Sequence, residues 1–248
     1  MIFKIQLFFF ALFFTLHTQT NAAVVVERLD THNKIATIKI VEKIQYGEEE
    51  ILERELDELS SEGYKLKLNA IQLNTRGGNA YASLQMGRLI RAKKLNTYVA
   101  KGSYCGSACV YVVAGGLVRM VYGRLTVHRK SFDERMYLES VEKFLKKGDE
   151  ETISYFREMG ISDLLSDAII MTPNWATREL TSTELQRWGI HATDRIYEEM
   201  WFRNTATETN NSLDNIRDIF DDNVISCVEM PVRFQMTMWE CVASRIPK

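Results

Sequence analysis

From residue 36 onward, the spacing of apolar positions alternates between that of a strand and that of a helix. Residues 36–44 and 68–74 show the extended, alternating pattern of strands, with many β-branched side chains in the first. Residues 48–61, between them, place isoleucine and leucine at the spacing of one helix face. The three segments predict a strand–helix–strand unit.

The alternation continues toward the C-terminus. The pattern predicts a helix over 80–95, a strand over 97–100, an apolar segment over 107–114, and strands near 117–122 and 125–128. Strands that alternate with helices favour a parallel sheet covered by helices. We therefore expect an α/β fold.

Helical patterns dominate the following stretch. Residues 132–171 are mostly helical in pattern and could form a lid or an assembly arm. Residues 180–189 are typical of a capped helix, with Thr181 or Ser182 as the N-cap and Glu184 in the first turn.

The C-terminal part reads differently. A short strand is expected at 194–197, and residues 204–211 are polar and linker-like. We divide the chain into a signal peptide (1–22), an α/β domain (23–200) and a C-terminal appendage (201–248).

The first residues have the pattern of a secretory signal. Lys4 supplies a positive start, residues 7–16 are almost purely apolar, and small residues follow at 20–22. An uncleaved anchor is the alternative, but it would need about 20 apolar residues to span a bilayer. We expect cleavage after Ala22 or Ala23, export to the periplasm or the medium, and no stable membrane anchor afterwards.

Composition narrows the class of protein. Of 248 residues, 46% are apolar and 26% are charged, as in ordinary globular domains. Lysine and arginine number 31 against 33 acids, and no dense basic tract is present to neutralise phosphates. Nucleic acid is therefore not an expected partner.

Export changes how the four cysteines are interpreted. An even number in an oxidising compartment permits two disulfides, in any of three pairings. We favour the most local pairing, although spacing alone does not fix it. A zinc site is the rival, but no histidine lies close by in sequence, so no metal is expected. The cysteines are Cys105, Cys109, Cys227 and Cys241.

Three short segments carry candidate chemistry. Gly77 and Gly78 close a strand and open a helix, where backbone N–H groups can approach an anion, although an ordinary tight turn has the same pattern. Ser107, among small residues before an apolar helix, is a candidate nucleophile or a plain N-cap. His128 ends an apolar strand and could move a proton or simply be solvated. All three segments are predicted at the carboxyl edge of a parallel sheet, where ligands bind.

The order of these motifs resembles a known family. Residues 73–78 (LNTRGG), 105–109 (CGSAC), 114–116 (AGG) and 127–129 (VHR) are similar to the motif series of the proteolytic subunit of Clp protease, in the Clp/crotonase superfamily. The similarity is greatest to an exported, periplasmic Clp-protease-like branch and spans roughly residues 36–196. It implies a repeated ββα spiral whose parallel sheet is covered by helices.

The resemblance also implies roles. Ser107 matches the nucleophile and His128 the general base, while Gly78 and Ala108 match the residues whose N–H groups form an oxyanion hole. It implies a peptide or protein substrate, no cofactor, and self-association into a homo-oligomer through helices placed like 132–171.

Two departures qualify the match. Thr75 and Arg76 stand where the family has Ser-Pro, and no acid stands near Thr177, where the aspartate that orients the histidine is expected. Asn174, Thr177 or Glu179 could take its place, since an orienting group needs only to hold the imidazole tautomer.

Two functions follow as expectations. The first is an exported serine hydrolase, a peptidase that works without ATP because an exported protein has no ATP supply; the sequence also contains no Walker motif. The second is an inactive binding or scaffolding protein that keeps the fold, which the missing aspartate favours. A crotonase-like acyl-CoA enzyme is disfavoured, because no adenine-binding signature appears.

Overall fold

The computed structural model describes residues 23–131, 138–228 and 237–247. Residues 1–22, for which the sequence predicts a signal peptide, lie outside the described residues. Within the described ranges, no helix has both the length and the apolar character needed to cross a membrane.

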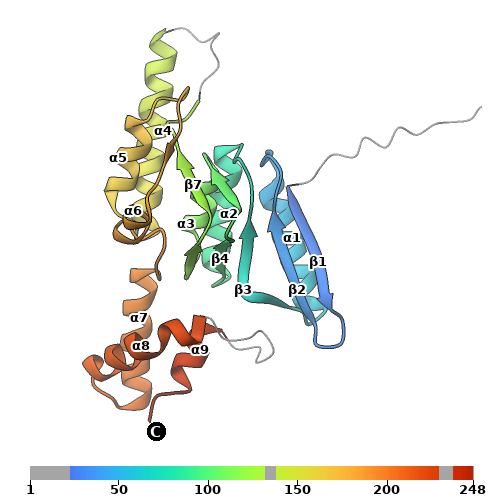
Figure 1. Ribbon diagram of the computed structural model, residues 1–248, viewed down its shortest axis with the longest axis vertical. Coiled ribbons are helices and arrows are strands. Elements are labelled where there is room, and N and C mark those ends of the chain that lie inside the picture. Colours follow the sequence, from blue (N-terminus) through green and yellow to red (C-terminus); the bar gives the residue numbers. More distant parts are fainter. Residues whose placement is uncertain (1–22, 132–137, 229–236, 248) are drawn as a thin grey trace, which may run out of the picture.

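A five-stranded, mostly parallel sheet forms the centre (Figure 1). Its spatial order is β1 (Val24–Asp30), β2 (Ile35–Ile40), β3 (Lys65–Leu73), β4 (Asn96–Val99) and β6 (Arg119–Val121). Only β1 runs antiparallel to its neighbour. The expectation of a mixed α/β fold with a largely parallel sheet is confirmed, while the repeated ββα spiral stays a prediction.

A second, three-stranded sheet carries the candidate chemistry. It consists of β5 (Tyr104–Gly106), β7 (Arg124–Val127) and β8 (Arg178–Glu179), with β5 parallel to β7 and β8 antiparallel to it. Thr75, just after β3, forms a bridge with Cys105, so the end of β3 reaches the second sheet.

Helices complete the body. The sequence pattern placed α1 (Glu48–Ser61) and α2 (Ala80–Ala92) correctly, and their apolar faces join the main core. Figure 1 shows α4 (Leu138–Glu158) and α5 (Asp163–Met171) side by side next to β7. The remaining short helices of this part are α3 (Cys109–Ala114) and α6 (Ser182–Arg187). Thr181 is the N-cap of α6 and forms a capping box with Glu184, as expected.

The C-terminal helices gather at the end of the molecule away from the start of α4 (Figure 1). They are α7 (Arg195–Thr209), α8 (Leu213–Val228) and α9 (Met238–Ala243), and their apolar side chains form a second core with Ala70, Val118 and Met120 of the sheet region.

A buried ionic cluster ties α7 to the sheet. Asp194, fully buried, caps α7 and forms an ion pair with Arg91, while the Arg119 guanidinium lies 4.0 Å from it. Arg119 also donates to the carbonyl oxygens of Ala114 and Met159. Burial, with a contribution from Arg91, lowers the pKa of Arg119 to about 9, so it stays charged at neutral pH.

Two expectations for this region are wrong. Residues 195–197 are helical instead of extended, because the Asp194 side chain accepts hydrogen bonds from the N–H groups of Ile196 and Tyr197. The polar stretch 204–211 is not a linker in its first part, since α7 continues through Thr209.

Candidate active site

Ser107 sits in a strained turn between β5 and α3. Its φ of 54° is left-handed, a conformation that costs a non-glycine residue on the order of 1–3 kcal/mol and recurs at functional sites. Its N–H donates to the Thr126 carbonyl oxygen (2.9 Å), which ties the turn to β7. Ser107 is not a plain N-cap, because Ala108 holds that position.

A disulfide brackets this turn. Cys105 and Cys109 are joined across Ser107, with Cα atoms 5.4 Å apart and both side chains fully buried. Cys227 and Cys241 form the second disulfide. The local pairing favoured from the sequence is therefore confirmed. The part of the chain that the structure describes holds no group of three or more potential metal ligands.

The two glycines are there because nothing larger fits. A Cβ on Gly77 (φ 85°) would lie 2.4 Å from the Gly106 carbonyl oxygen, and one on Gly78 (φ 151°) would lie 2.2 Å from the Ile44 carbonyl oxygen. Both distances are far below van der Waals contact. The Gly-Gly turn is thus packed against the Ser107 turn on one side and against residue 44 on the other.

Two backbone donors next to Ser107 are unused. Among the described residues, no hydrogen bond occupies the N–H of Gly78 or of Ala108, whereas the N–H of Gly77 donates to the Thr75 hydroxyl (3.0 Å). Free N–H groups at such turns can stabilise a developing oxyanion.

A small cavity joins these groups to the histidine. It has a volume of about 160 Å³, and the four residues singled out from the sequence all line it: Gly78, Ser107, Ala108 and His128. The rest of its wall is mainly apolar, with two polar residues, and consists of Ala80, Val110, Tyr111, Val127, Lys130, Ser131 and Ile169.

His128 is oriented by the backbone. The half-buried ring lies with Nδ1 at 2.7 Å from the Arg129 carbonyl oxygen. A carbonyl oxygen can only accept, so Nδ1 carries a hydrogen, and in the neutral imidazole the lone pair is on Nε2. Such a nitrogen can take a proton from a serine hydroxyl.

None of the three expected orienting residues bonds to His128 in the described structure. Glu179 is held by Arg124 (2.7 Å), whose hydrogen bond lowers the Glu179 pKa. Thr177 is exposed, and Asn174 lines a separate cavity of about 300 Å³. All three residues follow α5, on a segment that does not bring them to the His128 ring. The group that contacts Nδ1 is the Arg129 carbonyl oxygen.

Helix α4 and the C-cap residue of α5 hold the residues that follow His128. The Arg129 N–H donates to the Thr172 carbonyl oxygen (2.7 Å), and its guanidinium forms a two-point ion pair with Asp149, including Nε to Oδ1 at 3.2 Å. The Nζ of Lys130 lies 3.5 Å from Glu151. The sequence suggested a lid or an assembly arm for residues 132–171, and this role stays a prediction; within this stretch, Ile169 of α5 lines the cavity.

Helix α4 also fixes the cavity wall. The Tyr111 hydroxyl bonds to Thr152 (2.9 Å), and the Tyr155 hydroxyl donates to the Tyr111 carbonyl oxygen (2.6 Å). Burial raises the pKa of both tyrosines, so the two hydroxyls remain protonated.

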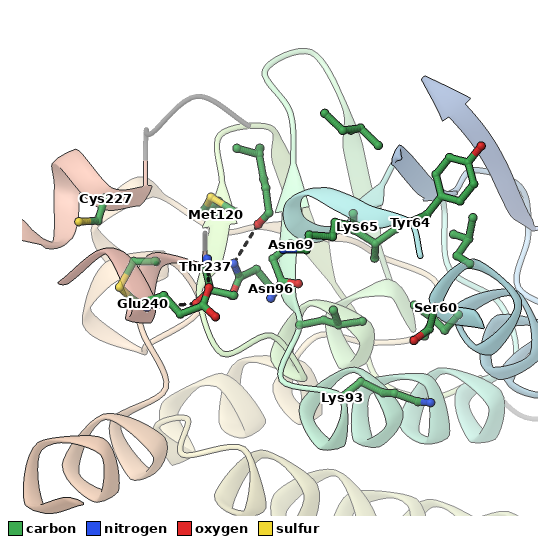
Figure 2. A pocket seen from close by; sticks show the side chains of 17 residues that line it. Ser60, Tyr64, Lys65, Asn69, Lys93, Asn96, Met120, Cys227, Thr237 and Glu240 are labelled. Carbon is green, nitrogen blue, oxygen red and sulfur yellow. Dashed lines mark hydrogen bonds between the residues drawn. The ribbon is translucent and has the colours of Figure 1, made fainter. Parts of the chain in front are cut away.

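A larger cavity lies between the sheet and the C-terminal helices. Its volume is about 350 Å³, and Figure 2 shows Asn69, Asn96, Thr237 and Glu240 around it. Their polar groups bond to the protein: the Asn96 side chain donates to the Leu68 carbonyl oxygen, and Glu240 belongs to a capping box. This larger cavity is not lined by any of the four candidate residues predicted from the sequence, Gly78, Ser107, Ala108 and His128.

Comparison with known proteins finds similarity only among solved structures. No protein-family model matches the sequence, and no curated protein matches it. Among solved structures, the chain is similar to a mutant of ClpP1 from Listeria monocytogenes, with a TM-score of 0.48 and 17% sequence identity over 65% of this chain and 90% of that one.

Proposed function

We propose that this chain is an exported, Clp-protease-like serine hydrolase that cleaves peptides without ATP. One observation carries the proposal: Ser107, His128 and the unused N–H groups of Gly78 and Ala108 surround one cavity of about 160 Å³. A hydroxyl, a base and two amide donors are the groups that acyl transfer requires.

The tautomer of His128 determines which ring nitrogen can accept a proton, and the proposed reaction starts at that nitrogen. Nε2 of His128 takes the proton of the Ser107 hydroxyl while the oxygen attacks the substrate carbonyl. The resulting oxyanion is bound by the N–H groups of Gly78 and Ala108. His128 then protonates the leaving amine as the C–N bond breaks, and water, deprotonated by the same nitrogen, hydrolyses the acyl-enzyme.

Other parts of the proposal have separate support. The apolar wall formed by Val110, Tyr111 and Ile169 suits an apolar side chain next to the scissile bond. Two disulfides suit an oxidising compartment, in line with the leader-like residues 1–22. The ββα spiral and the homo-oligomer rest on the resemblance of the four motifs.

A second function is favoured by one feature of the site. The group that bonds to Nδ1 of His128 is a neutral carbonyl, which stabilises an imidazolium less than a carboxylate does. Loss of the carboxylate costs about 10⁴ in turnover in serine proteases. An inactive scaffold that keeps the Clp-like fold is therefore the alternative.

A fluorophosphonate probe separates the two. The probe phosphonylates an activated serine, with fluoride as the leaving group, and does not require a known substrate. Wild type should be labelled and Ser107→Ala should not, while Ser103→Ala, four residues earlier and outside the cavity, should be labelled at the wild-type rate. Folded wild-type protein that takes up no probe would support the scaffold instead.

A further inference from the structure

Glu48 is a buried carboxylate that the proposed reaction does not use. It is the first residue of α1 and only 5% exposed. Its oxygens accept hydrogen bonds from two backbone N–H groups, Oε1 from Ala23 (2.9 Å) and Oε2 from Val24 (3.3 Å).

In the part of the chain that the structure describes, no full positive charge balances this carboxylate. Within residues 23–131, 138–228 and 237–247, no lysine, arginine or histidine forms an ion pair with Glu48. The N-terminus of α1 offers only about half an elementary charge. Buried carboxylates are normally paired with a cation, because desolvating an isolated charge is costly.

Leader cleavage would supply the missing cation. Hydrolysis of the bond between Ala22 and Ala23 consumes one water, leaves a carboxylate on Ala22 and frees the amine of Ala23, which then takes up a proton. The nitrogen that gains the charge is the one already 2.9 Å from Oε1 of Glu48.

We infer that Ala23 is the N-terminus of the mature protein and that its α-ammonium binds the Glu48 carboxylate. Cleavage one residue later would remove Ala23, which is fully buried and whose carbonyl oxygen accepts the Val41 N–H (3.0 Å). The site therefore distinguishes between the two cleavage positions that the sequence allows.

The ion pair between Ala23 and Glu48 would lie close in sequence to the loop that supports the Gly77–Gly78 turn. Glu48 follows the loop that contains Ile44, whose N–H donates to the Gly77 carbonyl oxygen (3.0 Å) and whose carbonyl oxygen accepts the Asn79 N–H (2.8 Å). The inference rests on the export part of the proposed function and not on hydrolysis.

The first test is the intact mass of protein exported from a host that processes the full chain. The expected mass is that of a chain starting at Ala23. A chain starting at Val24 would overturn the inference while leaving export intact, and an unprocessed chain would overturn both, whatever the result of probe labelling.

The second test is a double-mutant cycle on stability. Chains starting at Ala23 are compared with chains that carry one added glycine before it, each with Glu48 or Glu48→Gln. The glycine turns the ammonium back into an amide, so it should raise the equilibrium constant for unfolding about tenfold with Glu48 present, because hydrogen bonds to charged groups are stronger. It should have no such effect in Glu48→Gln.

Glu50→Gln is the matched control, since it removes the same charge from the same helix turn at an exposed position. In that background the added glycine should keep its tenfold effect. An equal effect of the glycine in the Glu48 and Glu48→Gln backgrounds, or none in either, would overturn the ion pair.

Discussion

The carbonyl oxygen of Arg129 lies 2.7 Å from Nδ1 of the preceding residue, His128. This contact leaves Nε2 as the acceptor, which is the tautomer that a general base for Ser107 needs. A backbone carbonyl cannot be mutated away, but the side chain that anchors its residue can. Asp149 of α4, which pairs with the Arg129 guanidinium, is that anchor.

Asp149→Asn should slow fluorophosphonate labelling about tenfold, the size of effect that loss of an orienting partner has on histidines that bind metals. The labelled fraction at completion should not change, because the Ser107 turn itself stays folded. The 15N shifts of the His128 ring should move away from the Nδ1–H form. Asp163→Asn, which breaks the comparable pair with Arg157, should alter neither property. An unchanged rate in Asp149→Asn would remove the anchoring role.

Gly78→Ala should abolish labelling and lower stability. The new Cβ would lie 2.2 Å from the Ile44 carbonyl oxygen, so the turn must shift, at a cost of about 1–3 kcal/mol for overpacking. Gly63→Ala is the control, because Gly63 also has a positive φ (78°) but nothing within 4 Å of a Cβ. It should lose only about 1–2 kcal/mol, with no loss of labelling rate. Chemical denaturation and the labelling rate measure the two effects.

The sequence predicted the fold best where one side-chain period dominates. Helices α1 and α2 and strands β2 and β3 have clear apolar faces, and each was expected within a few residues of its place. Strand β1 was not foreseen: it lies at the edge of the sheet and carries Glu27 and Arg28 among its valines, which weakens the pattern. At 195–197 a capping side chain overrides the extended preference of isoleucine and tyrosine.

The candidate site was predictable only in its side chains. Ser107, His128 and the Gly77–Gly78 turn stand out by residue type and order. The Arg129 carbonyl leaves no trace in the sequence, because every residue has one and only the fold decides where it points. Asp149 is likewise one of many acids on a charged helix, and its pairing with Arg129 depends on how α4 packs against the chain after β7.

Removing the disulfide next to Ser107 should affect function more than stability. In a chain-entropy estimate, the loop closed by Cys105 and Cys109 contributes about 2 kcal/mol and the longer one closed by Cys227 and Cys241 about 3 kcal/mol. The double serine variant at 105 and 109 should label more slowly, because the left-handed Ser107 turn loses its cross-link. The double serine variant at 227 and 241 should lose more stability and keep the labelling rate. Equal labelling rates in the two variants would show that the Cys105–Cys109 disulfide does not hold the Ser107 turn in place.

Acid should weaken the cap of α6. Hydrogen bonds from Thr181, backbone first, and the charge of Arg178 lower the pKa of Glu184 below its ordinary value. A carboxyl whose folded pKa is depressed adds stability above its unfolded pKa of about 4.3 and loses it as the pH falls through the folded value. Glu184→Gln should therefore cost up to about 1 kcal/mol at pH 7, and the difference from wild type should shrink as the pH falls below the unfolded pKa and through the lower folded one. Urea unfolding of both proteins across this range measures it, and a difference that stays constant with pH would assign the effect to packing instead of charge.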